Sequence, residues 1–152
     1  MTRLSWEQYF IKIAKLVAER SNCIRPAKGA LIVRDKMIIS TGYNGTPRGV
    51  KNCNEGGCPI CNAPDRASVS GTKLDECLCA HAEENAIIQA AYQGVSTKGA
   101  TLFSSHCPCL FCAKSIINAG IVKVYYNDAY PMTEKSIALF KEAGIELVKY
   151  ED

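Results

Sequence analysis

Two short motifs, far apart in the chain, constrain its fold because they carry side chains suited to one metal ion. The first is His-Ala-Glu at 81–83, and the second is Pro-Cys-x-x-Cys at 108–112. One imidazole and two thiolates suit Zn²⁺, and three protein ligands leave the fourth tetrahedral position open for water. An open position is typical of a catalytic metal, whereas four protein ligands are typical of a structural one. We therefore predict a catalytic zinc on His81, Cys109 and Cys112.

The local pattern brings the two motifs together at the starts of two helices. It places His81 and Glu83 in the first turn of one helix, and Pro108 at the first position of another, where its missing N–H costs nothing. Cys109 and Cys112 then project to one side of the second helix. Two helix N-termini aimed at one point favour thiolates, because each terminus carries partial positive charge.

Glu83 is suited to moving protons, because it lies near the metal motif without being a ligand. A carboxylate so placed can take a proton from water, protonate a ring nitrogen and later protonate departing ammonia. Each motif alone has a simpler interpretation: a lone histidine is usually packed or solvent-facing, and a lone Cys-x-x-Cys can be redox-active or structural. His106 and Cys107 stand beside the second motif and could be mistaken for ligands. The two motifs together favour catalysis.

The composition is that of an ordinary globular chain. With 152 residues, 47% apolar and 22% charged, we expect a single domain over residues 1–152. The net charge of +3 comes without a long basic tract, so we expect no nucleic-acid partner. No apolar run approaches a membrane span and residues 1–20 lack a signal-peptide core, so we expect no membrane partner and a cytoplasmic location. The nine cysteines favour reduced thiols and metal over disulfides.

Hydrophobic periodicity and turn residues predict four helices and five strands. The expected helices are Ser5–Arg20, Cys79–Tyr92, Pro108–Ala119 and Thr133–Ala143. The expected strands are Gly29–Arg34, Met37–Thr41, Ala100–Ser104, Ile121–Tyr126 and Ile145–Tyr150. The first two strands form a hairpin through Asp35 and Lys36, and the later strands follow the strand–helix–strand pattern of a parallel sheet. We therefore predict an α/β fold with a mixed five-stranded sheet covered by helices.

A cysteine-rich insertion, at about residues 50–80, has no convincing periodicity. It includes Cys53, Cys58, Cys61 and Cys77. A loop this long in a compact domain is normally functional or disordered. The stretch Cys-Pro-Ile-Cys at 58–61 resembles half of a zinc knuckle, and a second, structural zinc would pin an insertion that has no apolar core. Free or partly oxidised thiols are the alternative.

Beyond the zinc motifs, the chain resembles the deoxycytidylate (dCMP) deaminase family over about residues 4–150. Its His-x-Glu and Pro-Cys-x-x-Cys motifs match the signature of zinc nucleobase deaminases in general. The Gly-Tyr-Asn-Gly-Thr-Pro loop at 42–47 and the cysteine-bearing insertion separate this family from its relatives. Free cytidine deaminases usually have Cys in place of His81, and tRNA adenosine deaminases generally lack the insertion. Other matching stretches are Ser-Asn-Cys23-Ile-Arg25, Gly29-Ala30, Asn52-Cys53 and Glu83-Glu-Asn85.

The resemblance carries implications for fold, activity and assembly. It implies the three-layer α/β/α cytidine deaminase-like fold and the hydrolysis of dCMP to dUMP and ammonia, which feeds thymidylate synthesis. It implies one catalytic Zn²⁺ and, in some members, one structural Zn²⁺. It also implies a homohexamer that is commonly activated by dCTP and inhibited by dTTP.

Residue by residue, the resemblance assigns roles in binding the nucleotide. Asn44 would hydrogen-bond the sugar hydroxyl, and the Ala82 backbone N–H would meet the base carbonyl. Arg25 resembles the phosphate-contacting position, and a guanidinium holds a phosphate by two hydrogen bonds. Tyr126 or Tyr130 would close over the nucleotide.

The resemblance also suggests an effector site and ligands for the second zinc. The effector triphosphate would bind the loop from Gly45 to Gly49, with Arg48. The second-zinc positions are matched by Cys23, Cys53 and Cys58, and the fourth ligand would be Cys61, Cys77 or Cys79, with Cys77 favoured.

Two kinds of alternative function follow from the same residues. The first keeps the chemistry and changes the substrate to dCTP as well as dCMP, to a free nucleoside, or to adenosine in tRNA. Arg25 and the small net charge favour a small phosphorylated nucleotide. The second alternative is a non-catalytic zinc scaffold, in which the fourth coordination position would be closed.

Overall fold

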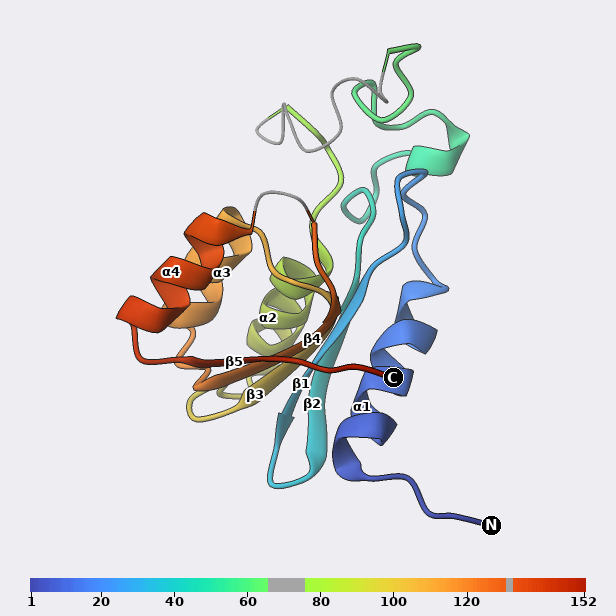
Figure 1. Ribbon diagram of the computed structural model, residues 1–152. Helices are drawn as coiled ribbons and strands as arrows, with labels where there is room; N and C mark the ends of the chain where they lie inside the picture. The colour runs from blue at the N-terminus through green and yellow to red at the C-terminus, as the bar shows by residue number, and fades with distance from the viewer. Residues whose placement is uncertain (66–75, 131–132) are drawn as a thin grey trace.

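A computed structural model describes residues 1–65, 76–130 and 133–152 of the chain, and Figure 1 shows a central sheet with helices on both faces. The strands are β1 Gly29–Arg34, β2 Met37–Tyr43, β3 Thr101–His106, β4 Lys123–Asp128 and β5 Glu146–Lys149. The sheet order is β2-β1-β3-β4-β5. β1 is antiparallel to both of its neighbours, whereas β3, β4 and β5 are parallel. The predicted mixed five-stranded sheet is confirmed.

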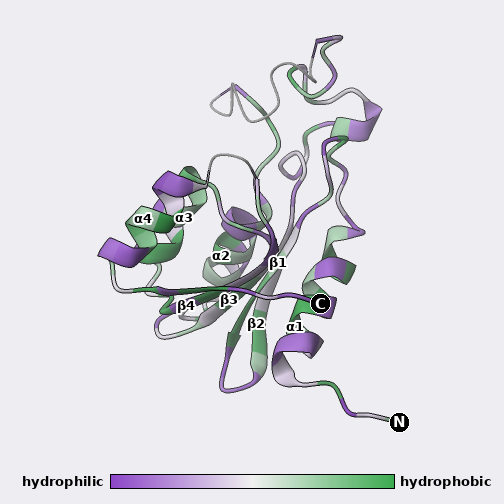
Figure 2. Ribbon diagram, viewed as in Figure 1, coloured by the Kyte–Doolittle hydropathy of each residue, from purple (hydrophilic) through white to green (hydrophobic). Residues whose placement is uncertain are grey.

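The helices form the outer two layers. The helices are α1 Trp6–Ala18, α2 Ala82–Gln93, α3 Leu110–Asn118 and α4 Glu134–Glu142. α1 covers one face, where Phe10 packs with Leu31 and Phe103, and the other three cover the opposite face. In Figure 2 α3 is mostly hydrophobic, whereas both ends of α4 are hydrophilic. The result is the expected three-layer α/β/α arrangement.

The local signals for turns and caps are confirmed. Ser5 and Gln8 form a capping box at the start of α1. The hairpin between β1 and β2 turns through Asp35 and Lys36, both at positive φ (55° and 63°), which a tight two-residue hairpin requires. α2 ends at Gly94, whose φ of 73° is the left-handed conformation that glycine adopts at little cost.

Two helix starts differ from the prediction by more than one residue, and both lie at the metal motifs. α2 begins at Ala82 rather than Cys79, so His81 is its N-cap with an extended backbone (ψ 155°) and is not in the first turn. α3 begins at Leu110 rather than Pro108, and Cys109 is its N-cap (ψ 170°). An N-cap residue lies half outside the helix, and neither His81 nor Cys109 makes a side-chain capping hydrogen bond. The prediction placed these residues inside the helices because periodicity cannot mark that boundary.

The insertion extends away from the sheet, at the top of Figure 1. Its described residues contain one short 3-10 helix, Cys53–Glu55. The rest of the predicted irregular stretch includes residues 66–75, which lie outside the described residues. No helix in the described part of the chain is long and apolar enough to span a bilayer.

α2 lies directly on β2, because Gly42 has no side chain. A Cβ at Gly42 would overlap the Ala82 carbonyl oxygen and the Ala86 nitrogen of α2. The close contact therefore sets the position of the first turn of α2, which carries the His-Ala-Glu motif.

We expect Gly42→Ala to lower the free energy of unfolding by about 3 kcal/mol or more, because α2 must move away from the sheet. The matched control is Gly144→Ala, where a Cβ meets nothing within 4 Å and φ is 75°. The control loses about 1–2 kcal/mol from backbone strain alone. Urea denaturation followed by circular dichroism measures both. Equal losses in the two variants would contradict the packing argument.

Candidate active site

The N-terminal ends of α2 and α3 bring one nitrogen and two sulfurs together. His81 Nδ1 lies 3.3 Å from Cys109 Sγ and 3.3 Å from Cys112 Sγ. The three side chains form one of the residue groups that could hold a metal ion. Tetrahedral zinc with ordinary Zn–N and Zn–S bonds holds the two kinds of atom about 3.6 Å apart. The donor set and its spacing therefore fit Zn²⁺.

The two sulfurs of this group interact strongly with each other. A hydrogen bond from Cys112, together with a smaller effect of His81, lowers the pKa of Cys109 to about 4. The same contact with Cys109, together with burial, raises the pKa of Cys112. A divalent cation would suit both sulfurs, because zinc binds cysteine as the thiolate.

Glu83 is buried beside this group, and its carboxylate is held by the sheet. The side chain is 4% exposed, and Ser104 Oγ of β3 donates a hydrogen bond of 2.7 Å to Oε1. Glu83 is not in the candidate metal group of His81, Cys109 and Cys112, so the carboxylate stays available for proton transfer. Sequence reasoning missed Ser104, because a serine in a buried strand carries no signal of its own.

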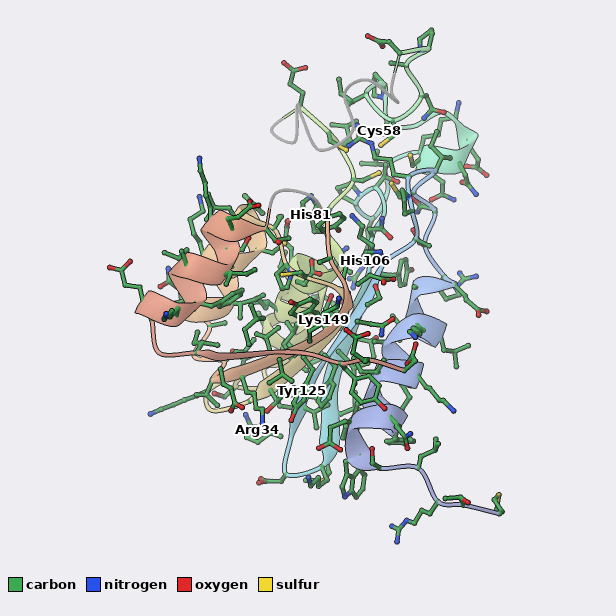
Figure 3. The ribbon with its side chains drawn as sticks, viewed as in Figure 1. Arg34, Cys58, His81, His106, Tyr125 and Lys149 are labelled. Carbon is green, nitrogen blue, oxygen red and sulfur yellow. The ribbon has the colours of Figure 1, made fainter. Side chains whose placement is uncertain are left out.

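His106 and Cys107, the two alternative ligands beside the second motif, are not part of the three-residue group. His106 Nδ1 lies 3.0 Å from Ser105 Oγ. Cys107 is fully buried, and burial raises the pKa of its thiol to about 12. In Figure 3 His81 lies between Cys58 and the sheet, with His106 nearer the sheet.

Asn44 is buried at the end of β2, where its side chain joins two segments. Its Oδ1 accepts a 2.8 Å hydrogen bond from the Lys28 backbone N–H, and its Nδ2 donates to the Pro26 carbonyl at 3.2 Å. One Nδ2 hydrogen and one Oδ1 lone pair remain for a ligand hydroxyl. The Ala82 backbone N–H is in the first turn of α2, where helical N–H groups have no partner within the helix.

Arg25 has a buried donor without a partner. Among the described residues, Arg25 Nη2 is one of three buried side-chain atoms that make no hydrogen bond. Buried polar groups are normally paired, and a guanidinium is best paired with a carboxylate or a phosphate. The atom therefore fits an anionic ligand.

Lys28 is a second cation at the site, and the sequence interpretation missed it. Its Nζ lies 4.0 Å from the centroid of the Tyr130 ring. Burial lowers the pKa of Lys28, while the nearby Glu83 and Cys109 charges raise it. The available signal was its position, three residues after Arg25 and directly before a buried strand.

The structure separates the two candidate tyrosines. Tyr130 stacks on the His106 ring with the centroids 5.5 Å apart, and burial together with the charges of Glu83 and Cys109 raises its pKa. Tyr126 is buried in β4, where burial raises its pKa and the neighbouring charge that matters most is Cys107. Tyr130 therefore lies within the electrostatic reach of the metal group and Glu83.

The residues predicted to bind an effector lie in the loop after β2. Gly45 pairs with Ala80 through two backbone hydrogen bonds of 3.2 Å and 2.8 Å, directly before His81. Arg48 is exposed, and its guanidinium carbon lies 4.6 Å from the Tyr92 ring centroid. Gly49 is exposed with a φ of 81°.

Six cysteines outside this centre also lie together, in two overlapping groups. The first group is Cys23, Cys53, Cys61 and Cys79, and the second is Cys58, Cys61, Cys77 and Cys79. The four predicted ligands of the second zinc, Cys23, Cys53, Cys58 and Cys77, are thus divided two and two between the groups. The groups share Cys61 and Cys79, the two residues that the sequence left as alternatives to Cys77.

The chain matches known proteins along most of its length. Residues 4–128 match the model of the cytidine and deoxycytidylate deaminase zinc-binding region. Among the relatives, the deoxycytidylate deaminase of Schizosaccharomyces pombe is 47% identical over 148 residues, and that of Saccharomyces cerevisiae is 45% identical over 150 residues. These alignments cover 97% and 99% of this chain but only 45% and 46% of the yeast proteins. The chain therefore spans just under half the length of these two curated relatives.

A solved structure is similar over the whole of both chains. It is the crystal structure of a dCMP deaminase from the cyanophage S-TIM5 in complex with dCMP and dUMP, with a TM-score of 0.81 and 33% identity. The match covers 99% of this chain and 100% of the phage chain. With the family model covering well over half of its residues, the chain belongs to the cytidine and deoxycytidylate deaminase family.

Proposed function

We propose that this chain hydrolyses dCMP to dUMP and ammonia, and so supplies dUMP for thymidylate synthesis. One observation carries the proposal: a nitrogen and two sulfurs suited to zinc converge beside the buried carboxylate of Glu83. The yeast deoxycytidylate deaminases and the phage dCMP deaminase with dCMP and dUMP bound support the choice of substrate. The proposed cofactor is Zn²⁺, with one catalytic ion on His81, Cys109 and Cys112 and further zinc on the cysteine cluster.

Glu83 is the proposed proton carrier. A zinc ion bound to the three ligands would supply a water molecule of lowered pKa. Glu83 would take one proton from the attacking water and give it to the ring nitrogen of cytosine. It would then take the remaining proton of the added hydroxyl and pass it to the leaving amine, which departs as ammonia. The hydrogen bond from Ser104 to Oε1 holds the carboxylate in a fixed orientation for these transfers.

The other residues bind and orient the nucleotide. The Ala82 N–H faces the base carbonyl, the Asn44 side chain binds the sugar hydroxyl, and Tyr130 covers the nucleotide. Arg25, with its unpaired Nη2, and Lys28, with its half-buried ammonium, supply two positive charges for the 5′-phosphate. A monophosphate suits this pair because each oxygen gains a charge-assisted hydrogen bond.

We propose a cytoplasmic location from the cysteine content, and the assembly and regulation from the family resemblance. The nine cysteines are all free thiols in the structure, which suits a reducing compartment such as the cytoplasm. The resemblance to the dCMP deaminase family supports a homohexamer, with dCTP as activator and dTTP as inhibitor. The pairing of Gly45 with Ala80 would link an effector in the 45–49 loop to the segment that carries His81.

We expect Glu83→Gln to keep its zinc and its fold but to lose at least about 10²–10⁴-fold in kcat, because no other group carries the proton. The matched control is Glu84→Gln, which removes the neighbouring carboxylate of the same helical turn. Release of ammonia from dCMP measures activity, and a zinc assay on the same samples measures the metal. Near-normal turnover in Glu83→Gln would exclude the proposed role.

We expect Arg25→Gln to lower kcat/KM for dCMP by roughly 10–100-fold, because hydrogen bonds to a charged group contribute about 1.5–3 kcal/mol. The kcat/KM for deoxycytidine, which has no phosphate, should stay unchanged. Arg20→Gln, at an exposed arginine beside α1, is the control. The assay compares dCMP, dCTP, deoxycytidine and CMP in each variant. Equal losses on dCMP and deoxycytidine would show that Arg25 does not bind the phosphate. A wild-type enzyme that acts on adenosine in tRNA and on none of these four compounds would refute the proposed substrate.

We expect dCTP to raise the rate at low dCMP concentration and dTTP to lower it. Arg48→Ala should raise the dCTP concentration for half-maximal activation by roughly tenfold or more, because a charge-assisted contact to the triphosphate is lost. Lys51→Ala, which removes an exposed charge of the same region, is the control. Steady-state kinetics with both effectors measure the response. A wild-type enzyme that ignores both nucleotides would refute the proposed regulation.

A further inference from the structure

The six cysteines outside the active site come from three separate parts of the chain. Cys23 follows α1, Cys53 and two others lie in the first part of the insertion, and Cys77 and Cys79 lie at its end, on the approach to α2. Four of the six thiols are buried, and three of these, Cys53, Cys58 and Cys61, are completely so. Figure 3 shows Cys58 among these sulfur atoms, farther from the sheet than His81. The fold thus gathers six thiols where the described residues offer little other core.

The sulfur–sulfur distances in this cluster are those of thiolates on shared zinc. The sulfur–sulfur separations are 3.9 Å for Cys23–Cys61, 4.0 Å for Cys61–Cys79, and 3.6 Å for both Cys58–Cys77 and Cys61–Cys77. Two thiolates on one tetrahedral zinc lie about 3.8 Å apart, given Zn–S bonds of about 2.3 Å. A disulfide would need about 2.05 Å. The spacing fits zinc and does not fit disulfides.

A single zinc ion cannot use all six thiols, because zinc takes four ligands in a structural site. An ion in the first group leaves Cys58 and Cys77 without metal, and an ion in the second leaves Cys23 and Cys53. If two zinc ions share Cys61 and Cys79, every sulfur binds zinc and each ion has four ligands. The two groups overlap in just these two residues.

We propose that the cluster holds two Zn²⁺ ions, bridged by the thiolates of Cys61 and Cys79. Cys23 and Cys53 complete the shell of one ion, and Cys58 and Cys77 complete the shell of the other. Six thiolates and two zinc ions leave a net charge of −2, and the Leu78 backbone N–H, 3.3 Å from Cys58 Sγ, offsets part of it. With the active-site ion, the chain binds three zinc ions. This inference does not depend on which nucleotide is the substrate.

The bridged cluster would hold the active-site segments in place. Cys79 stands two residues before His81, and Cys23 stands two residues before Arg25. The Asn54 backbone N–H donates a 2.9 Å hydrogen bond to the Asn22 carbonyl, so the insertion is also tied directly to the Cys23 segment. Metal binding by such sites supplies folding energy where an apolar core is missing. The cluster therefore positions residues of the site without touching substrate.

The test is a zinc count on the full-length protein after a weak chelator has removed surface metal, followed by ¹¹³Cd NMR of the cadmium-substituted protein. We expect three zinc ions per chain. We expect three cadmium resonances, two of which are split by coupling to each other through the shared sulfurs. Two ions per chain, or three resonances without a mutually coupled pair, would overturn the proposal.

Variants assign the ions to the two sites. The double variant Cys58→Ser with Cys77→Ser should lose one ion, and the double variant Cys23→Ser with Cys53→Ser should also lose one. In both variants the splitting of the cadmium resonances should disappear, because only one ion remains in the cluster. Cys107→Ser, which removes a buried thiol that belongs to neither cysteine group, should keep three ions and is the matched control. If a double variant fails to fold, the wild-type count and spectrum still decide the question. A protein that binds three zinc ions but does not deaminate dCMP would refute the proposed function and leave the cluster intact.

Discussion

The convergence of two helix N-termini on one point is the constraint on which the rest of this structure depends. His81 and Cys109 are N-cap residues, so their side chains leave the helices while the free N–H groups of the first turns face the same space. Partial positive charge at both ends favours the thiolates that zinc requires. The sheet and its outer layers serve this geometry: β2 positions α2 through Gly42, and β3 supplies the serine that holds Glu83.

Charge is distributed around the site in a way that suits a small anionic nucleotide. Anionic groups, namely Glu83 and the sulfurs, lie at the metal end. The cationic side chains of Arg25 and Lys28 lie on the segment between α1 and β1, with Tyr130 against the lysine. A ligand with a phosphate at one end and a neutral base at the other would place its negative charge near the two cations and away from the anionic groups. The distribution of charge therefore supports the proposed nucleoside monophosphate substrate.

Much of the fold could be predicted from the sequence, because its signals are local. The hairpin at Asp35 and Lys36, the capping box at Ser5 and the glycine that ends α2 each depend on a few adjacent residues. The metal ligands and Glu83 could be named because their spacing is short and specific. Lys28, Ser104 and the grouping of the six cysteines could not, because only the packing of distant segments brings these side chains together. The helix starts at the metal motifs were wrong for a related reason, since hydrophobic periodicity does not distinguish an N-cap from a first turn.

The contact between the Cys61 and Cys77 sulfurs has a consequence for the length of the chain between them. Their sulfurs lie 3.6 Å apart, so the chain leaves the cluster and returns to it at one place. Once the two ends of a segment are held together, each doubling of its length costs only about 0.6 kcal/mol. A change in the number of residues between these cysteines therefore costs little conformational entropy once the cluster has formed. Divergence in length among related proteins is expected to concentrate there, and the sheet and the two converging helices should stay constant in size.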